Sequence, residues 1–333
     1  MTVESVERQD SAMPSTTERL QDPKEYVRLS ALAELLMADM ESLPVVEAIA
    51  LCLDDPSEDV RGLAVEVLVR FGPGAVRALS HALEVQQPVA VRIAAASALA
   101  RLGPDAAPAM DSLCRSVHHE DPMLRWHAGF ALSKIGPPAI PALQPLMQST
   151  DPRVVATAVD ALERIGPEAK EAQEDIQQLA MGTSLPQLQL ACATALVSIT
   201  GDSASGKPVV ANALTHGDVD LRKSCIQRLG DLGPGANDYG EELLQGAEDP
   251  SAEVRAVSAL ALAKVVEDPA IAVPPLTKML DDSDPEVRTN AAIALTRYGP
   301  AAAPALPKLQ VLQQEKEERV AAVAAAAIPK IQE

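Results

Sequence analysis

Apolar residues recur along this chain at the spacing of one helix face, in blocks that share one pattern. Residues 54–61 read D-D-P-S-E-D-V-R, and residues 281–288 read D-D-S-D-P-E-V-R. Counting from the final arginine of each block, apolar residues occupy positions −1, +3, +6, +7 and +10. These positions lie on one side of a helix with 3.6 residues per turn. The pattern therefore predicts an amphipathic helix that is used repeatedly.

The block is repeated along nearly the whole chain, and we number each repeat from its arginine, which we call the anchor position. Anchors follow one another every 30 to 34 residues, with Val155, Gln189 and Ala321 in the three weakest copies. The arginine anchors are Arg28, Arg61, Arg92, Arg125, Arg222, Arg255 and Arg288. Acidic residues and Pro precede most anchors, as suits a helix N-terminus, and Gly-Pro often follows, ending one helix and starting another. Each unit thus predicts two helices that must stack on their neighbours.

The complete pattern, D-x-x-V-R-x-x-A-x-x-A-L-x-x-I/L-G-P, resembles the HEAT repeat over about residues 20–331. It resembles in particular the short variety first named for phycobilisome lyases. This resemblance implies an all-α superhelix, an α-solenoid of about nine helix pairs behind a leading helix near residues 22–37. We expect a disordered tail over residues 1–18 and the solenoid over 19–333. A bend is expected near 180–210, because two neighbouring copies there lack the arginine.

Composition agrees with closely packed helices. Hydrophobic residues make up 47 % of the 333 residues but aromatic ones only 2 %, so Ala, Leu and Val must form the core. The four cysteines fall inside apolar helical stretches without a CxxC pair, as expected of core residues in a reducing compartment. The N-terminus lacks a signal peptide, and no apolar run is long enough to span a membrane. We expect a cytoplasmic protein.

The net charge of the chain limits the classes of partner that we expect it to bind. The chain carries 28 basic and 47 acidic residues, a net charge of −19, which repels phosphate backbones and anionic lipids. We therefore expect no nucleic-acid partner. A basic or amphipathic protein segment is the expected ligand.

Motifs that would indicate an enzyme are weak. Residues 201–207 match G-x-x-x-x-G-K, but Pro208 stands where a phosphate-binding loop needs Ser or Thr, and a repeat helix precedes the match. The run His118-His119-Glu120 offers too few ligands for a metal site, although iron hydroxylases built on HEAT repeats use His-Glu pairs. We predict no catalytic residue, no metal and no cofactor.

The anchor arginines form a column that we interpret as structural. Most of them follow Asp or Glu by a few residues, and in HEAT-like arrays such pairs tie neighbouring turns together. The ladder that we predict consists of Arg61, Arg92, Arg125, Arg222, Arg255 and Arg288.

The helix face opposite the apolar stripe, at positions +1, +5 and +8, is expected to line a concave groove. Trp126 and Phe130 share this face and comprise the single Trp and one of two Phe residues. Further apolar candidates on the face are Val69, Ile93, Leu190, Val197, Leu260 and Ile293. Either these side chains anchor an apolar or amphipathic partner segment, or they pack between adjacent anchor helices.

We predict a non-catalytic scaffold or adaptor that binds a partner protein segment in this groove. The alternative is a subunit similar to the bilin lyases, which handle a tetrapyrrole chromophore; a chromophore would also need aromatic and apolar lining. The last helix, Val320 to Ile328, is apolar on nearly every side. Either a partner or a second copy covers it, or this end frays.

Overall fold

The computed structural model describes residues 15–37, 44–204 and 206–333, and every regular element in these ranges is a helix. The helices that carry the anchor positions, the anchor helices, alternate with return helices. The anchor helices are α2 (Glu25–Met37), α4 (Glu58–Arg70), α6 (Val89–Leu102), α8 (Pro122–Ile135), α10 (Pro152–Ile165), α12 (Pro186–Thr200), α14 (Val219–Leu232), α16 (Ala252–Val265), α18 (Pro285–Leu295) and α20 (Glu318–Gln332). This alternation confirms the predicted α-solenoid.

The return helices are shorter, and several begin with a 3-10 turn. They are α3 (Pro44–Leu51), α5 (Val76–Ala82), α7 (Met110–Val117), α9 (Ile140–Leu143), α11 (Gln173–Gly182), α13 (Lys207–His216), α15 (Gly240–Ala247), α17 (Pro269–Met279) and α19 (Leu306–Leu312), with the short α1 (Thr16–Arg19) before α2. The 3-10 turns are η1 (Cys52–Asp54), η2 (Gly72–Ala75), η3 (Gly103–Ala109), η4 (Pro137–Ala139), η5 (Pro145–Gln148), η6 (Gly166–Ala172), η7 (Gly233–Tyr239) and η8 (Thr296–Ala305).

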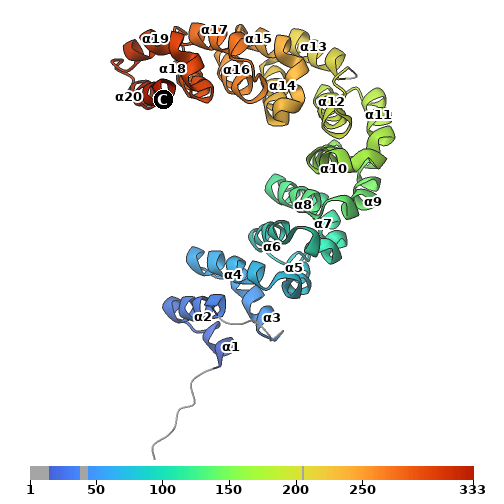
Figure 1. Ribbon diagram of the computed structural model, residues 1–333. Helices are drawn as coiled ribbons and strands as arrows, with labels where there is room; N and C mark the ends of the chain where they lie inside the picture. The colour runs from blue at the N-terminus through green and yellow to red at the C-terminus, as the bar shows by residue number, and fades with distance from the viewer. Residues whose placement is uncertain (1–14, 38–43, 205) are drawn as a thin grey trace, which may run out of the picture. The chain divides into compact units, whose positions relative to one another are not determined.

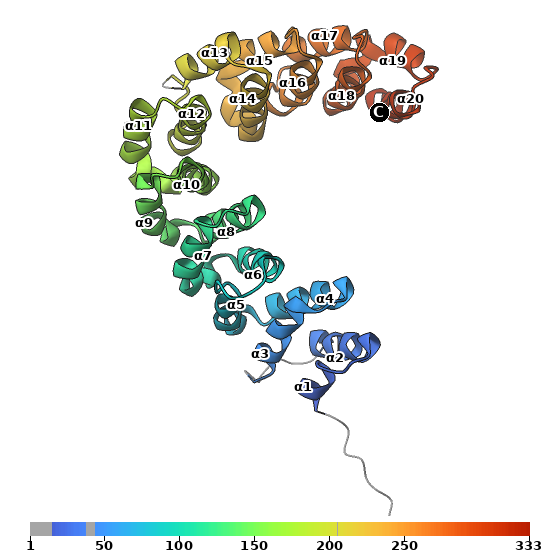
Figure 2. The same cartoon turned by 180° about the vertical axis from the view of Figure 1, so that it is seen from behind.

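The chain divides into two compact units, the first ending at Leu146 and the second comprising Met147–Glu333. Within each unit the anchor helices lie side by side in one row and the return helices form a second row (Figure 1 and Figure 2). In the first unit α6 packs against α8, and in the second α14 packs against α16 and α16 against α18. The boundary falls before residues 180–210, which lie wholly in the second unit, so the bend expected there stays a prediction.

Local sequence explains where the helices begin and end. The side chain of Asp121 accepts hydrogen bonds from the backbone N–H groups of the first turn of α8, and Asp284 does the same for α18. At the Gly-Pro junctions the glycine has a positive φ, 57° at Gly233 for example, which an L side chain adopts only with strain. The Gly-Pro motif therefore reverses the chain between the two helices of a pair.

The core forms between the two rows from the predicted stripe. In α8 the residues at −1, +3, +6, +7 and +10 from Arg125 are fully buried: Leu124, Ala128, Ala131, Leu132 and Ile135. Three cysteines, Cys52, Cys192 and Cys225, are buried among such residues, and Cys114 is half-buried. All four thiols are unpaired, and burial raises the pKa of Cys192 to about 12, which suppresses the reactive thiolate.

The two ends of the chain refine the sequence prediction. Most of the expected tail, residues 1–14, lies outside the described residues, while Ser15 caps α1, which packs on α2. The leading anchor helix thus has a short helix before it that the periodicity did not indicate. At the other end α20 buries Val320, Ala324, Ala327 and Ile331 and leaves Ala322 and Ala326 exposed. Association through α20 stays a prediction.

Candidate functional site

Two aromatic side chains, Trp126 and Phe130, lie along one stripe of α8 together with Lys134, and His127 lies beside them. We call these four residues the α8 aromatic surface. The Trp126 and Phe130 rings stack with centroids 5.1 Å apart and an angle of 8° between planes. Lys134 Nζ lies 5.1 Å from the Phe130 centroid, and the His127 ring meets Trp126 edge-on at 4.8 Å. The stripe exists because residues four apart share a helix face.

The side chains of the α8 aromatic surface are held by their neighbours and are partly exposed to solvent. Trp126 is 48 % exposed, whereas Phe130 beneath it is half-buried. Burial lowers the pKa of His127, so the imidazole is neutral at neutral pH. A stacked tryptophan that is held in place but open to solvent loses little side-chain entropy when a ligand covers it.

The other groove candidates divide into three groups. Ile293 is 43 % exposed, and Val69, Ile93 and Leu260 are half-buried. Leu190 and Val197 are buried, so the expectation that they would be exposed is wrong. The loop that follows α12 explains Val197: a Cβ on Gly206 would lie 3.5 Å from Val197 Cγ2, so this loop covers the +8 position. Leu190 belongs to the same core cluster of the second unit.

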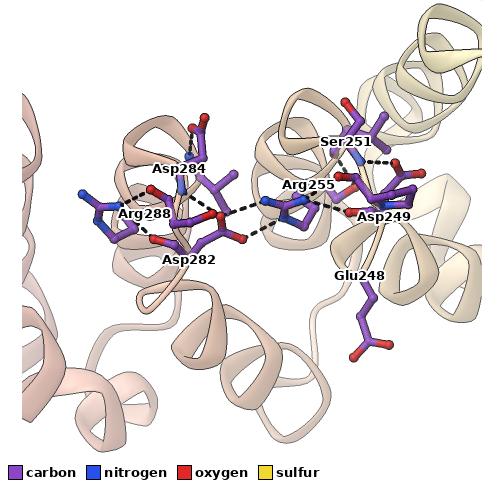
Figure 3. Close-up of polar contacts among 12 residues, drawn as sticks. Glu248, Asp249, Ser251, Arg255, Asp282, Asp284 and Arg288 are labelled. Carbon is purple, nitrogen blue, oxygen red and sulfur yellow. Dashed lines mark hydrogen bonds and ion pairs between the residues drawn. The ribbon is translucent and has the colours of Figure 1, made fainter.

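The anchor arginines bind the turns between repeats, in two directions (Figure 3). Arg255 Nη1 donates to the Asp249 and Pro250 carbonyls at 2.9 and 3.1 Å, on the turn that precedes its own helix. Its Nε and Nη2 donate to both carboxylate oxygens of Asp282 at 2.7 and 2.9 Å, in the next repeat. Asp282 in turn accepts from Arg288 through its backbone carbonyl at 2.8 Å.

This ladder is continuous only where an acidic residue follows the anchor by 27 positions. Such pairs are Arg28–Asp55, Arg222–Asp249, Arg255–Asp282 and Arg288–Glu315. Position 27 after Arg61 is Pro88 and after Arg92 is His119, and these two arginines donate to backbone carbonyls of neighbouring turns. Arg125 Nη1 donates to the carbonyls of His119 and Glu120. These guanidinium groups thus have acceptors within the protein, and their role in stabilising the stacking of repeats stays a prediction.

A cavity of about 890 Å³ lies on the anchor helices α10, α12 and α14 of the second unit. Its charged centre is Arg228 of α14, which reaches across α12 to two carboxylates of α10. Arg228 Nη2 donates to Asp160 Oδ1 at 2.6 Å, and Nη1 donates to Glu163 Oε2 at 2.9 Å and Thr194 Oγ1 at 3.3 Å. We call this hollow the α10–α14 cavity. The sequence pattern did not indicate it, because Arg228 lies 65 positions after Glu163 and 68 positions after Asp160.

Glu163 is the most perturbed acid in the cavity. Burial, reinforced by the charge of Asp160, raises the pKa of Glu163 to about 7, although Arg228, Thr194 and Arg164 oppose this change. At the cavity, α12 packs far less on α14 than α14 does on α16. This looser packing coincides with the break of the ladder at Val155 and Gln189.

The two enzyme-like motifs occupy ordinary structural positions. Residues 201–207 follow the helix α12 rather than a strand, and the carbonyl of Ser203 accepts a hydrogen bond from Tyr239 Oη at 3.0 Å. His118 is exposed, and His119 Nδ1 accepts from the Asp121 N–H at 3.0 Å. Over residues 15–37, 44–204 and 206–333, no three His, Cys, Asp or Glu side chains gather as metal ligands.

Comparison with known sequences bears on the repeat directly. The sequence model of HEAT repeats matches residues 46–118, 110–183 and 240–329, most of the chain. The chain belongs to the HEAT-repeat family. No curated protein matches this HEAT-repeat chain in sequence.

Solved structures resemble this chain at low sequence identity. A chain from the complex of Kap95p with RanGDP is 16 % identical with a TM-score of 0.51, over 95 % of this chain and 50 % of that one. An importin beta structure gives 15 % identity, the same coverage and a TM-score of 0.45. An engineered protein is 22 % identical over 96 % of this chain and 98 % of that one, with a TM-score of 0.40. The HEAT-repeat chain thus spans about half the length of the matched chain of the Kap95p complex and of the importin beta chain.

In the part of the chain that the structure describes, no helix is both long enough and apolar enough to cross a bilayer.

Proposed function

We propose that this HEAT-repeat protein is a non-catalytic scaffold that binds a basic or amphipathic segment of a partner protein, with the α8 aromatic surface as the main contact. The observation that supports this proposal is the exposure of Trp126, the single tryptophan of the chain, on a stack that Phe130 holds in place. Tryptophan is the residue type most enriched among energetically dominant interface residues.

The expected gain from covering Trp126 is large enough to matter. About half of its surface is exposed, which corresponds to roughly 100 Å² for a large aromatic side chain. At about 25 cal/mol per Å², burying this area contributes about 2.5 kcal/mol, or roughly 50- to 100-fold in affinity. Exposed apolar area of this kind does nothing for the stability of the isolated chain.

The net charge of the chain and the stacked Trp126 and Phe130 rings indicate what kind of partner segment would bind. A net charge of −19 favours a basic partner electrostatically, and Lys134 over the Phe130 ring leaves the Trp126 ring as the accessible apolar contact. Kap95p, a protein of similar fold, binds RanGDP in its structure. That likeness concerns the fold alone, so the present proposal depends on the α8 aromatic surface.

The test compares Trp126→Ala with Val85→Ala in affinity captures from native lysate, quantified by mass spectrometry. Val85 is an even more exposed apolar residue of the same unit, at 73 %, and has no aromatic neighbour in the stack. We expect at least one captured protein to fall by more than tenfold with Trp126→Ala and to remain with Val85→Ala, while both variants keep the wild-type circular dichroism spectrum. Equal capture by both variants would refute the α8 aromatic surface as the contact.

The lyase-like alternative has its own readout. If the protein handles a tetrapyrrole, mixing it with a bilin shifts the bilin's absorbance, and Trp126→Ala alters that shift. An unchanged bilin spectrum together with Trp126-dependent capture supports the scaffold.

A further inference from the structure

The arginine ladder is interrupted at Val155, where both members of a ladder pair are absent. Other repeats pair the anchor arginine with an acid 27 positions later, as Arg255 does with Asp282. Here the anchor residue is Val155, and the residue 27 positions later is Gly182. A pocket of about 420 Å³ lies at this place in the second unit and is lined by both residues. We call it the Val155 pocket.

Two backbone carbonyls beside Val155 lack the donor that an anchor arginine supplies. Before Val155, the carbonyls five and six positions earlier belong to Thr150 and Ser149, and both residues line the pocket. In five other repeats the anchor arginine donates from Nη1 to the two equivalent carbonyls, at 2.7 to 3.1 Å: Arg28, Arg61, Arg125, Arg255 and Arg288. Within the described ranges, no donor reaches the carbonyl of Ser149 or Thr150. The turn before α10 thus keeps the acceptors of a guanidinium group without the guanidinium.

The neighbouring repeat, which also lacks the arginine, supplies a donor of its own. Gln189 Nε2 donates to the carbonyl of Thr183, six positions before it, at 2.8 Å. Val155 has no polar side-chain atom and cannot do the same for Ser149. Of these two adjacent repeats, the one with Val155 therefore leaves its turn open to a donor from outside.

The Gly182 side of the pocket gives a ligand room to enter. A Cβ added to Gly182 would meet nothing within 4 Å, and its φ is not positive, so the backbone does not require glycine there. A side chain from outside can therefore use the space that the ladder acid fills in other repeats. Val155, Leu179 and Leu188 line the pocket with apolar surface, on which the methylene stem of a long side chain can pack.

The chemistry of the lining favours a cationic donor over an apolar side chain. An apolar occupant would take the carbonyls of Ser149 and Thr150 out of water without a partner, which is unfavourable. In the described part of the chain, the charged residue of the lining is an acid, Asp175. Arg153, which follows the turn, is paired with Asp151 at 2.7 Å. Arginine fits better than lysine, because its planar group offers several donors in fixed directions, as the anchor arginines show.

We propose that the Val155 pocket binds the guanidinium group of an arginine side chain from the partner segment, which donates to the carbonyls of Ser149 and Thr150. This inference rests on the proposed function and deepens it, since it assigns a second contact, on the second unit, and gives it a residue type. It requires no contribution from the α8 aromatic surface.

The probe is N-acetyl-arginine amide, titrated into ¹⁵N-labelled full-length protein, with N-acetyl-leucine amide as the control ligand. We expect the arginine probe to shift the backbone amide signals of Asp151, Gly182 and Thr183 in a saturable way. The leucine probe should bind at least tenfold more weakly, because it offers the pocket an apolar side chain without a donor.

Three variants decide the assignment. Val155→Arg gives the turn the guanidinium that other repeats carry, so it should weaken binding of the arginine probe by more than tenfold. Gly182→Asp supplies the acid of a ladder pair and should strengthen binding about tenfold through a charge-assisted hydrogen bond. Gly235→Asp adds the same charge at another glycine with open space around its Cβ, outside the pocket, and should change binding less than twofold. A gain of binding cannot result from misfolding, so Gly182→Asp remains decisive even if Val155→Arg disturbs α10.

Three results would overturn the inference: no saturable shift with the arginine probe, leucine binding as tightly as arginine, or Gly182→Asp changing binding no more than Gly235→Asp. Failure here is distinguishable from failure of the proposed function, because the probe needs no partner. If arginine binds as expected while Trp126→Ala leaves capture unchanged, the α8 aromatic surface is refuted and the Val155 pocket stands. The converse results refute the pocket alone.

Discussion

Neutralising Asp282 should weaken the contact that Arg255 makes with the next repeat, and the adjacent Asp281 provides a matched control. Asp282 is 12 % exposed and receives both Arg255 donors, and its Oδ1 also accepts the Asp284 N–H at 2.9 Å. Asp281 is 66 % exposed and is paired with Lys308. Asp281→Asn and Asp282→Asn therefore delete the same charge at neighbouring positions that differ in burial.

The expected cost follows from what Arg255 loses. Removing one partner of a buried ion pair costs about 3–5 kcal/mol, because the other charge stays buried. The side-chain amide oxygen that Asp282→Asn introduces can still accept one bond, and Arg255 keeps its two backbone carbonyls, so we expect a cost of about 2 kcal/mol. Asp281→Asn removes an exposed pair and should cost less than about 0.5 kcal/mol.

Hydrogen exchange measured by mass spectrometry is the appropriate assay, because a repeat array opens locally. Asp282→Asn should accelerate exchange in α16 and α18 by roughly 30-fold at pH 7, and Asp281→Asn should change it little. Hydrogen bonds from Arg255 hold the pKa of Asp282 below its usual value, so its stabilisation is present above about pH 4 and is lost as the pH falls further. The two variants should therefore converge in acid. Equal exchange in both variants at pH 7 would refute the ladder as a source of stability.

Three other predictions concern the fold and the cavity. Gly233→Ala should cost about 1–3 kcal/mol in urea unfolding because its φ is 57°, whereas Gly235→Ala, with an ordinary φ and nothing within 4 Å of the added Cβ, should be neutral or stabilising; equal effects would contradict the backbone argument. Tyr298→Phe should cost about 1–2 kcal/mol in thermal unfolding, because the buried carbonyls of Leu262 and Val266 lose the hydroxyl, and a cost near zero would show that water replaces it. Burial raises the pKa of Glu163 to about 7, so its contribution to the free energy of unfolding is full below about pH 4.5 and declines by about 3 kcal/mol as the pH rises through 7. Glu163→Gln should therefore flatten the pH dependence of the unfolding free energy over that range. An unchanged pH profile would show that Glu163 is not the group that titrates there.

Periodicity in the sequence predicted the helix pairs, the buried stripe and the Gly-Pro reversals, because each depends on residues within one repeat. The carboxylate partners of the ladder were not predicted: the sequence pattern pointed to acids a few residues before the arginines, whereas the structure pairs four anchor arginines with an acid 27 positions later. Burial of Leu190 and Val197 was not predicted either, because it depends on the loop after α12 and on the packing of neighbouring repeats.

The α10–α14 cavity was the least predictable feature. Asp160 and Arg228 lie in anchor helices that are not consecutive, and their contact depends on how widely α12 and α14 are spaced. No spacing rule within one repeat encodes that distance. The Trp126–Phe130 pair, in contrast, is four residues apart, so its shared face could be read directly from the sequence.

The central claim, that a partner protein covers the α8 aromatic surface, is tested most directly by photo-crosslinking. The aromatic photo-reactive residue p-benzoylphenylalanine replaces Trp126 in one protein and Val85 in another, and both are irradiated in native lysate. We expect a discrete protein adduct at position 126 that competing wild-type protein suppresses, and no such adduct at position 85. No adduct at either position, or the same adducts at both, would contradict it.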